Sequence, residues 1–222
     1  MPANFPTRRT VSDAHAAWEE SMLRQVETLR AGLRARSAQQ VALLCGASLD
    51  GEALNFSYWG QPVRVLWPAL EPCRQEDGSS LPLNDQALLL YYLHTADGAA
   101  VADRWASFRE LPGGGFYFQA FQGYSGDLLA KAFAAELPGG KTPEDFRAAC
   151  QNAGGWALEA LSPYAFAFDA LPKIRLAAVL WPGDEDFPTK AGILFDASST
   201  HYLPIDGMAM LGSKLARHIL RS

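Results

Sequence analysis

Two apolar runs near the C-terminal end of the chain constrain its fold more than any other feature. Residues 165–171 and 174–181 each have the length of a strand, and the connection between them is Leu171-Pro172-Lys173. Such a short connection suits a tight hairpin, whereas parallel strands need a crossover of about a dozen residues. The two runs are therefore predicted to pair as antiparallel strands, and residues 192–195 are predicted to form a third strand.

A second pair of strands is predicted in the first half of the chain. Apolar residues alternate along residues 54–58 and 63–67, on either side of Gly60-Gln61-Pro62, and this pattern is typical of a β-hairpin. Residues 71–83 are rich in turn-forming residues and are predicted to form a loop. Residues 116–121 fit neither the helical period nor the strand period cleanly.

Helices are predicted where apolar residues recur at helical spacing between residues that begin or end helices. Ser12 can cap a long first helix, Gly46 ends a short second helix, and Asn84 can cap an apolar third helix. Thr142, followed by a proline and two acidic residues, is a strong helix start. The last helix is predicted to start at Asp206 and to bury a stripe formed by Met208, Leu211, Leu215 and Ile219.

Together these elements predict an α+β fold in one domain over residues 1–222, with a largely antiparallel sheet and helices packed around it. Residues 1–36 are expected to form an N-terminal helical segment, and residues 37–222 are expected to form the core. A chain of this length can bury about 70% of the surface that it exposes when unfolded.

The charge balance argues against nucleic acid or an anionic membrane as a partner. The chain has 19 Lys and Arg against 24 Asp and Glu, a net charge of −5, and no basic stripe stands out. No apolar run approaches the roughly 18–20 residues that span a bilayer. Cys45, Cys73 and Cys150 are scattered and suggest no disulfide framework, so a cytoplasmic location is expected.

Common nucleotide-binding and catalytic motifs are incomplete or missing. Gly139-Gly140-Lys141-Thr142 looks like the end of a phosphate-binding loop, but Ala135 stands where that motif needs a glycine. Gly113-Gly114-Gly115 lacks the third glycine of a dinucleotide fingerprint and is interpreted as a turn. No serine elbow and no H-E-x-x-H zinc motif occurs. Cys45 and Cys150 lie on predicted apolar helix faces, where a buried and inert thiol is the usual outcome. No motif indicates a cofactor.

Asp196 and His201 are candidate ligand-binding residues. They flank a Ser-Ser-Thr turn at the end of a predicted strand, where binding residues tend to collect. Arg109 and Glu110 are further candidates, because neighbours on a strand point to opposite faces and one of the two is then expected to face inward. An inward Arg109 would need a partner such as Asp196, or would bind an anion.

A metal site is a second hypothesis for the same region. Asp184, Glu185, Asp196 and Asp206 can supply oxygen ligands to a hard cation such as Mg²⁺ or Ca²⁺. Most of these residues also have a structural interpretation. Asp184 and Glu185 suit the solvated tip of a hairpin, and Asp206 suits the N-cap of the last helix.

Several motifs occur in order along the chain, among them Leu90-Tyr-Tyr-Leu, Phe108-Arg-Glu-Leu-Pro-Gly-Gly and Trp181-Pro-Gly-Asp-Glu-Asp-Phe-Pro. In this order they resemble a prokaryotic family known only as domain of unknown function 3786. The resemblance implies a setting in anaerobic redox or one-carbon metabolism, and it implies that some relatives carry a cysteine-rich iron–sulfur segment. This chain lacks that segment and has Ile205-Asp206 where an acidic pair is expected.

The sequence supports three hypotheses about function. The first is a soluble cytoplasmic binding or accessory protein that holds a small molecule or a protein partner. The second is a metal-assisted enzyme that uses Asp184, Asp196 and His201 as ligands or as a general base. The third is a structural subunit whose apolar surface docks on a partner. If the carboxylates and His201 converge around a pocket, the hypothesis of a metal-assisted enzyme is favoured.

Overall fold

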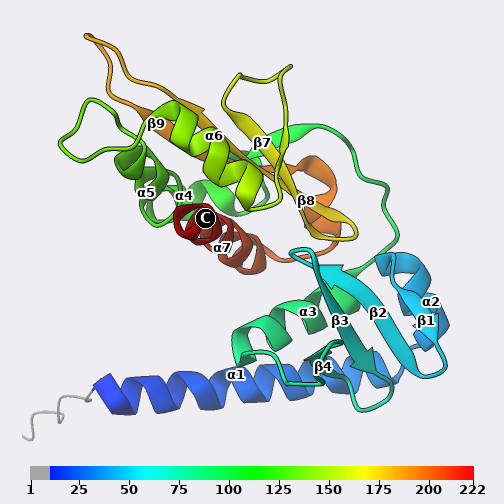
Figure 1. The fold of residues 1–222 in the computed structure, drawn as a ribbon. Helices are drawn as coiled ribbons and strands as arrows, with labels where there is room; N and C mark the ends of the chain where they lie inside the picture. Colours follow the sequence, from blue (N-terminus) through cyan, green and yellow to red (C-terminus); the bar gives the residue numbers. More distant parts are fainter. Residues whose placement is uncertain (1–10) are drawn as a thin grey trace, which may run out of the picture.

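Two antiparallel sheets, one in each half of the chain, organise the fold (Figure 1). The computed structural model describes residues 11–222, with side chains described from Glu19 onward. The N-terminal half (residues 11–95) comprises α1 Val11–Arg34, α2 Ala38–Cys45, β1 Ser48–Asp50, β2 Ala53–Tyr58, β3 Gln61–Leu66, β4 Glu71–Arg74 and α3 Leu83–Thr95. The linker (residues 96–104) leads into the C-terminal half.

The C-terminal half (residues 105–222) carries the second sheet and the remaining helices. Its elements are β5 Trp105–Ser107, the 3-10 helix η1 Phe108–Glu110, α4 Gly114–Gly123, α5 Gly126–Ala132, α6 Pro143–Asn152, β6 Trp156–Ala157, β7 Ala165–Leu171, β8 Ile174–Trp181, β9 Lys190–Asp196, the 3-10 helix η2 Ala197–His201 and α7 Ile205–Arg221.

The N-terminal sheet has the order β1-β2-β3-β4 and is a simple meander. Trp59 and Gly60 alone join β2 to β3, and both have positive φ, 52° and 75°. Two consecutive positive φ angles suit the tight hairpin turns whose twist matches that of the strands. Leu54, Phe56 and Tyr58 point to the buried face of the sheet, against which α3 packs. The turn therefore projects at the end of a well-packed hairpin.

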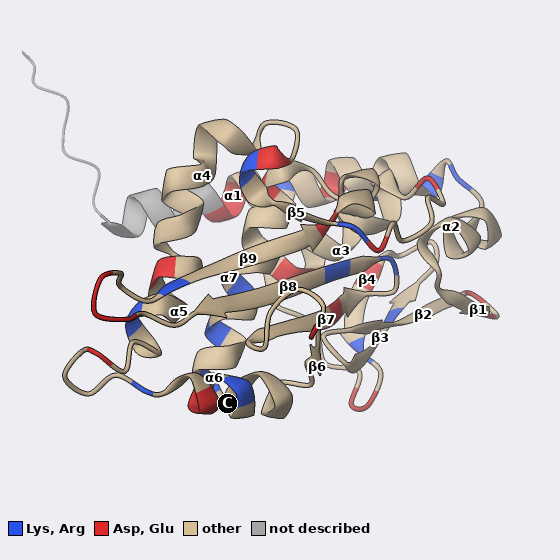
Figure 2. Ribbon diagram, turned by 90° about the horizontal axis from the view of Figure 1, so that it is seen from above, with Lys and Arg blue, Asp and Glu red and all other residues tan. Residues whose placement is uncertain are grey.

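The C-terminal sheet has the order β5-β9-β8-β7-β6, and all its pairs are antiparallel. Figure 2 shows β7, β8 and β9 side by side in front of α7, with charged residues mostly near the strand ends and in the loops. Helix α7 packs on this sheet through its apolar stripe of Met208, Leu211, Leu215 and Ile219, each 0% exposed. A stripe at this spacing on one side of a helix is what packing against a sheet requires.

One hydrophobic cluster runs through both halves. The rings of Tyr92 on α3 and Tyr202 after η2 lie 5.7 Å apart between centroids. A second contact joins the two halves: the backbone N–H of Trp59 donates to the carbonyl of Ala170 on β7 at 3.0 Å. The two sheets are thus tied together by core packing and by a backbone hydrogen bond.

The α+β prediction with antiparallel strands is confirmed, and the strands divide between two sheets. The hairpin after Leu171 is confirmed, since Leu171 pairs directly with Ile174. Thr142 caps α6 as predicted and forms a reciprocal capping box with Asp145. Gly46 ends α2 in the left-handed conformation, also as predicted.

Two predicted helix caps are wrong. Helix α3 starts at Leu83 with Pro82 as its N-cap, and α7 starts at Ile205 with Pro204 as its N-cap, so neither Asn84 nor Asp206 is a cap. The carbonyl groups of the two prolines accept the first helical hydrogen bonds, from the N–H of Gln86 at 3.0 Å and from that of Met208 at 3.1 Å, so each helix begins before the predicted cap. Helix α1 begins at Val11, and the side chain of Ser12 lies outside the described side chains.

Two other segments differ from the prediction. Residues 71–74 form strand β4 instead of loop, because they pair with β3 from Leu66 back to Val63. Residues 114–123 form α4, which settles the ambiguous aromatic segment as helical. Gly114 allows the helix to start there, since a Cβ at this position would lie 1.8 Å from the carbonyl oxygen of Phe108.

Truncation of the α7 stripe should destabilise the whole protein. We expect Leu215→Ala to lower the free energy of unfolding by about 2–5 kcal/mol, because it removes buried methyl groups and leaves a cavity. Urea denaturation followed by circular dichroism measures this change. Leu43→Ala on α2 is the control, because Leu43 is 79% exposed and its loss should cost less than about 0.5 kcal/mol. Equal effects of the two substitutions would contradict the described role of α7.

Candidate functional site

A cleft of about 760 Å³ lies between α7 and the N-terminal half. The N-terminal half contributes Tyr58 and Trp59 from the β2–β3 hairpin and the start of α3 from Pro82 to Leu88. Tyr124, which follows α4, closes one side. Cavities of roughly 300–1,000 Å³ with aromatic walls and a few polar groups are typical of small-molecule sites.

The long wall of the cleft is the face of α7 opposite its apolar stripe. Residues three and four apart share one face of a helix, so a single amphipathic helix can pack on a sheet with one side and line a cavity with the other. Figure 1 shows α7 between the C-terminal sheet and α3. The lining residues of α7 are Asp206, Ala209, Met210, Ser213, Lys214, Arg217, His218 and Arg221.

An ion pair between Lys214 on α7 and Asp85 on α3 crosses the cleft. The Lys214 Nζ lies 2.6 Å from Oδ1 and 2.7 Å from Oδ2 of Asp85. The Tyr58 hydroxyl donates to Asp85 Oδ1 at 2.8 Å and accepts from Lys214 Nζ at 3.0 Å. The ammonium group also lies 4.7 Å from the centroid of the Tyr58 ring. Three elements distant in sequence therefore meet in one polar cluster.

This cluster is shielded from solvent to different degrees. The side chain of Asp85 is 15% exposed and that of Lys214 is 41% exposed. Burial raises the pKa of the Tyr58 phenol well above its usual range; the charge of Asp85 and its hydrogen bond add to this, and the nearby Trp59 side chain acts against it. The phenol therefore stays protonated at neutral pH and acts as a hydrogen-bond donor.

Three further basic side chains follow Lys214 along the cleft: Arg217, His218 and Arg221. Among the described residues, neither arginine forms an ion pair within 4.0 Å. His218 lies beside Trp59, with 6.4 Å between the ring centroids. The C-terminal turns of α7 thus present positive charge next to an aromatic side chain.

Arg109 and Glu110 lie in η1 and not on a strand, so the predicted alternation of their side chains was wrong. Both residues are exposed. Glu110 accepts a hydrogen bond from the backbone N–H of Ser107 at 2.7 Å, and this bond lowers the pKa of its carboxyl group. The strand β5 ends at Ser107 because the chain turns there into the capped 3-10 helix.

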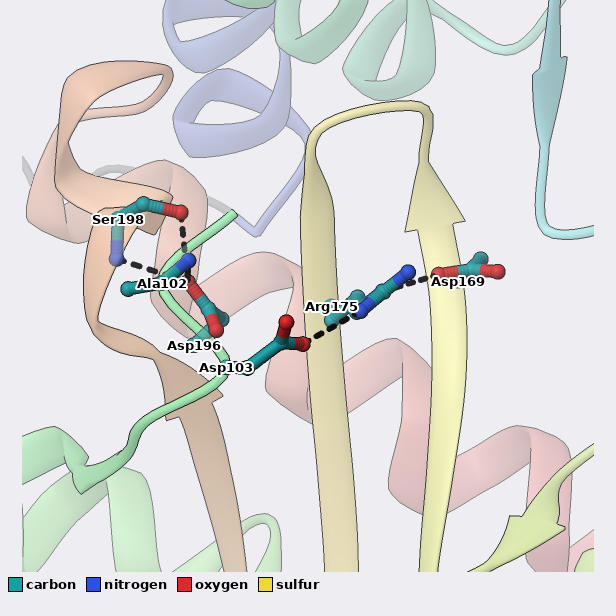
Figure 3. A network of polar contacts seen from close by, with 6 residues as sticks. All are labelled: Ala102, Asp103, Asp169, Arg175, Asp196 and Ser198. Atoms are coloured by element: carbon teal, nitrogen blue, oxygen red, sulfur yellow. Dashed lines mark hydrogen bonds and ion pairs between the residues drawn. The ribbon is translucent and has the colours of Figure 1, made fainter. Parts of the chain in front are cut away.

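Asp196 is fully buried and holds the linker (Figure 3). Its Oδ1 accepts hydrogen bonds from the Ser198 hydroxyl at 2.6 Å, the Ser198 N–H at 2.9 Å and the Ala102 N–H at 3.0 Å. Burial acts to raise the pKa of Asp196, but the hydrogen bonds from Ser198, Ala102 and Arg104 outweigh it, so that the pKa is lowered. The charged carboxylate is the form that this site stabilises.

His201 and Arg175 also form polar contacts to the linker. His201 Nδ1 lies 2.6 Å from Asp97 Oδ2, and both side chains are about half exposed. Arg175 on β8 contacts Asp103 at 2.7 Å and Asp169 at 3.0 Å (Figure 3). Neither Asp196 nor His201 lines the cleft.

The structure does not bring the four carboxylates of the metal hypothesis together. Asp184 and Glu185 lie in the turn before β9, Asp196 lies at the far end of β9, and a strand of this length spans about 20 Å. Asp206 is in the first turn of α7. Among the side chains that the structure describes, those of residues 19–222, no three His, Cys, Asp or Glu form a group that can hold a metal ion.

Cys45 and Cys150 are not placed for nucleophilic chemistry. Cys45 and Cys150 are buried, as predicted. Burial raises the pKa of Cys45 to about 11 and raises that of Cys150 well above its usual range. Both thiols therefore stay protonated at neutral pH, and the thiolate is the reactive form.

Sequence reasoning did not find the Tyr58–Asp85–Lys214 cluster. Its members lie in three separate elements and follow no motif. The usable signal was the spacing of Lys214, Arg217, His218 and Arg221, which places four basic side chains opposite the apolar stripe of α7.

The family model described as "Domain of unknown function (DUF3786)" matches residues 37–218. The chain therefore belongs to this family, as its sequence motifs suggested. The matched residues include the whole lining of the cleft except Arg221. Comparison with curated proteins and with solved structures found no match. In the part of the chain that the structure describes, no helix is long and apolar enough to cross a bilayer.

The ion pair across the cleft should show measurable coupling. In a double-mutant cycle with Asp85→Asn and Lys214→Met, we expect a coupling energy of about 1–2 kcal/mol, because the pair is partly shielded and charge-assisted. Urea denaturation of the four proteins measures it. The exposed pair Glu20–Arg24, whose side chains are 71% and 65% exposed, is the control and should couple by less than about 0.5 kcal/mol. Coupling no larger than in this control would contradict the described bridge.

Asp196 should make stability depend on pH in the acidic range. A carboxylate whose folded pKa lies below its ordinary value of 3.8 stabilises the fold above that value, and this contribution is lost as pH falls through the folded pKa. We expect Asp196→Asn to reduce the free energy of unfolding by about 1–3 kcal/mol at pH 7. The difference from the wild type should shrink below pH 3.8. Urea denaturation at several pH values tests this, and a difference that stayed constant with pH would count against it.

Proposed function

We propose that this protein is a cytoplasmic small-molecule-binding protein whose site is the cleft along α7. The observation that carries the proposal is the cleft itself, which both halves build and which combines aromatic walls with a few charged groups. Its volume suits a ligand of drug or cofactor size. The prokaryotic redox or one-carbon setting that the family resemblance implies is part of this proposal.

The polar cluster in the cleft supports binding over catalysis. All three N–H groups of a lysine ammonium can be used here, since Lys214 contacts both oxygens of Asp85 and the hydroxyl of Tyr58. A lysine whose N–H groups are all engaged in hydrogen bonds is poorly placed to act as a nucleophile or base. The phenol of Tyr58 is held in its protonated form. These groups fix the shape of the cleft and leave the bound molecule chemically unchanged.

The proposal is tested by filling the cleft. N-phenyl-1-naphthylamine, a neutral dye whose fluorescence rises in apolar surroundings, is the probe. We expect wild-type protein to bind it and Ala209→Trp to lose most of this binding, because Ala209 lies on the cleft face of α7. A fluorescence titration gives the dissociation constant, and circular dichroism confirms that the variant is folded.

Ala31→Trp is the matched control, because Ala31 is an exposed residue of α1 outside the cleft. It adds the same indole ring without filling the site, and its binding should equal that of the wild type. If the wild type does not bind the dye, or if folded Ala209→Trp binds it as well as Ala31→Trp does, the cleft is not the binding site.

A further inference from the structure

We infer that the ligand is an organic anion, with a carboxylate or phosphate group held by Arg217 and Arg221 and a planar apolar body that extends along α7. This inference rests on the proposed function and adds the chemical class of the ligand. Both arginines line the C-terminal end of the cleft, one turn apart on the same face of the helix.

The two arginines carry charge that the cleft does not neutralise. Lys214 is paired with Asp85, so it leaves no charge for a ligand. The other carboxylate of the lining, Asp206, lies in the first turn of α7. About 16 Å of helix separates it from Arg217 at 1.5 Å per residue, which is roughly twice the screening length at physiological salt. One end of the cleft is therefore positive.

This positive end contrasts with the rest of the molecule. The chain as a whole has a net charge of −5, so a local excess of positive charge attracts anions to this place and not to the surface at large. The C-terminal end of α7 contributes only about half a negative charge through its dipole, and this cannot balance two guanidinium groups. A guanidinium can donate two parallel hydrogen bonds to a carboxylate or a phosphate, which favours these two head groups.

The aromatic and apolar lining defines the rest of the ligand. Trp59 lies beside His218 and thus next to the positive end. Leu88 and Met210 continue the apolar surface toward Tyr124. Planar rings stack on such side chains with gains of about 0.5–1.5 kcal/mol beyond the burial of their area. An anion joined to an aromatic or otherwise planar body uses both parts of the site.

Isothermal titration calorimetry with three probes tests the inference. We expect phenyl phosphate to bind about tenfold or more tightly than either phenol or inorganic phosphate, since only phenyl phosphate uses both the arginines and the aromatic wall. Arg217→Gln and Arg221→Gln should each weaken phenyl phosphate by about tenfold and should weaken N-phenyl-1-naphthylamine less, because the dye has no anionic group.

Two further variants are controls for the substitutions of Arg217 and Arg221. Arg24→Gln removes an exposed arginine of α1 outside the cleft and should leave the affinity for phenyl phosphate unchanged. Arg109→Gln tests the rival anion site suggested by the sequence and should also have no effect, because Arg109 on η1 lies outside the cleft.

The outcomes separate the two proposals. If the dye binds in the cleft but phenol binds as tightly as phenyl phosphate, or if Arg109→Gln weakens phenyl phosphate more than Arg217→Gln and Arg221→Gln do, the anion inference is wrong and the proposed function stands. If the dye does not bind in the cleft, the proposed function fails, and the inference that rests on it fails with it.

Discussion

The packing of α7 on the C-terminal sheet is the constraint on which the rest of the structure depends. Its apolar stripe is fully buried against the sheet, so the opposite face must point toward the N-terminal half. A helix has a fixed period, and the position of the stripe therefore fixes the direction of Lys214, Arg217 and Arg221. The composition of the candidate site follows from a requirement of the core.

The contact between the two halves has apolar parts, which mainly stabilise the fold, and polar parts, which mainly fix its geometry. Packed aromatic rings such as Tyr92 and Tyr202 supply buried area, which is the main source of stability. The Asp85–Lys214 pair adds less free energy, because desolvation offsets much of its attraction. Its main effect is geometric: it fixes the distance between α3 and α7, and that distance sets the width of the cleft.

Local signals in the sequence were enough to predict much of the fold. The capping box at Thr142 and the tight hairpin after Leu171 each involve residues close in sequence, and both are confirmed. The predicted caps Asn84 and Asp206 failed because a preceding proline starts each helix earlier. The site could not be predicted from the sequence, for a different reason. Tyr58 and the residues it contacts meet only through tertiary packing, which no spacing within one element encodes.

The contacts that hold the linker in place affect how a ligand would enter the cleft. Asp196 holds the linker at Ala102, and His201 contacts it at Asp97, so the connection between the halves is anchored near both of its ends. Both contacts come from the C-terminal half, and the hydrophobic cluster shared by the two halves opposes a hinge opening where α3 meets the linker. Under the proposed function, the cleft is thus open and shaped before a ligand arrives, and binding needs no closure step. Little free energy goes into reorganising the protein, and the rate of encounter is set by diffusion and by the charge at the entrance.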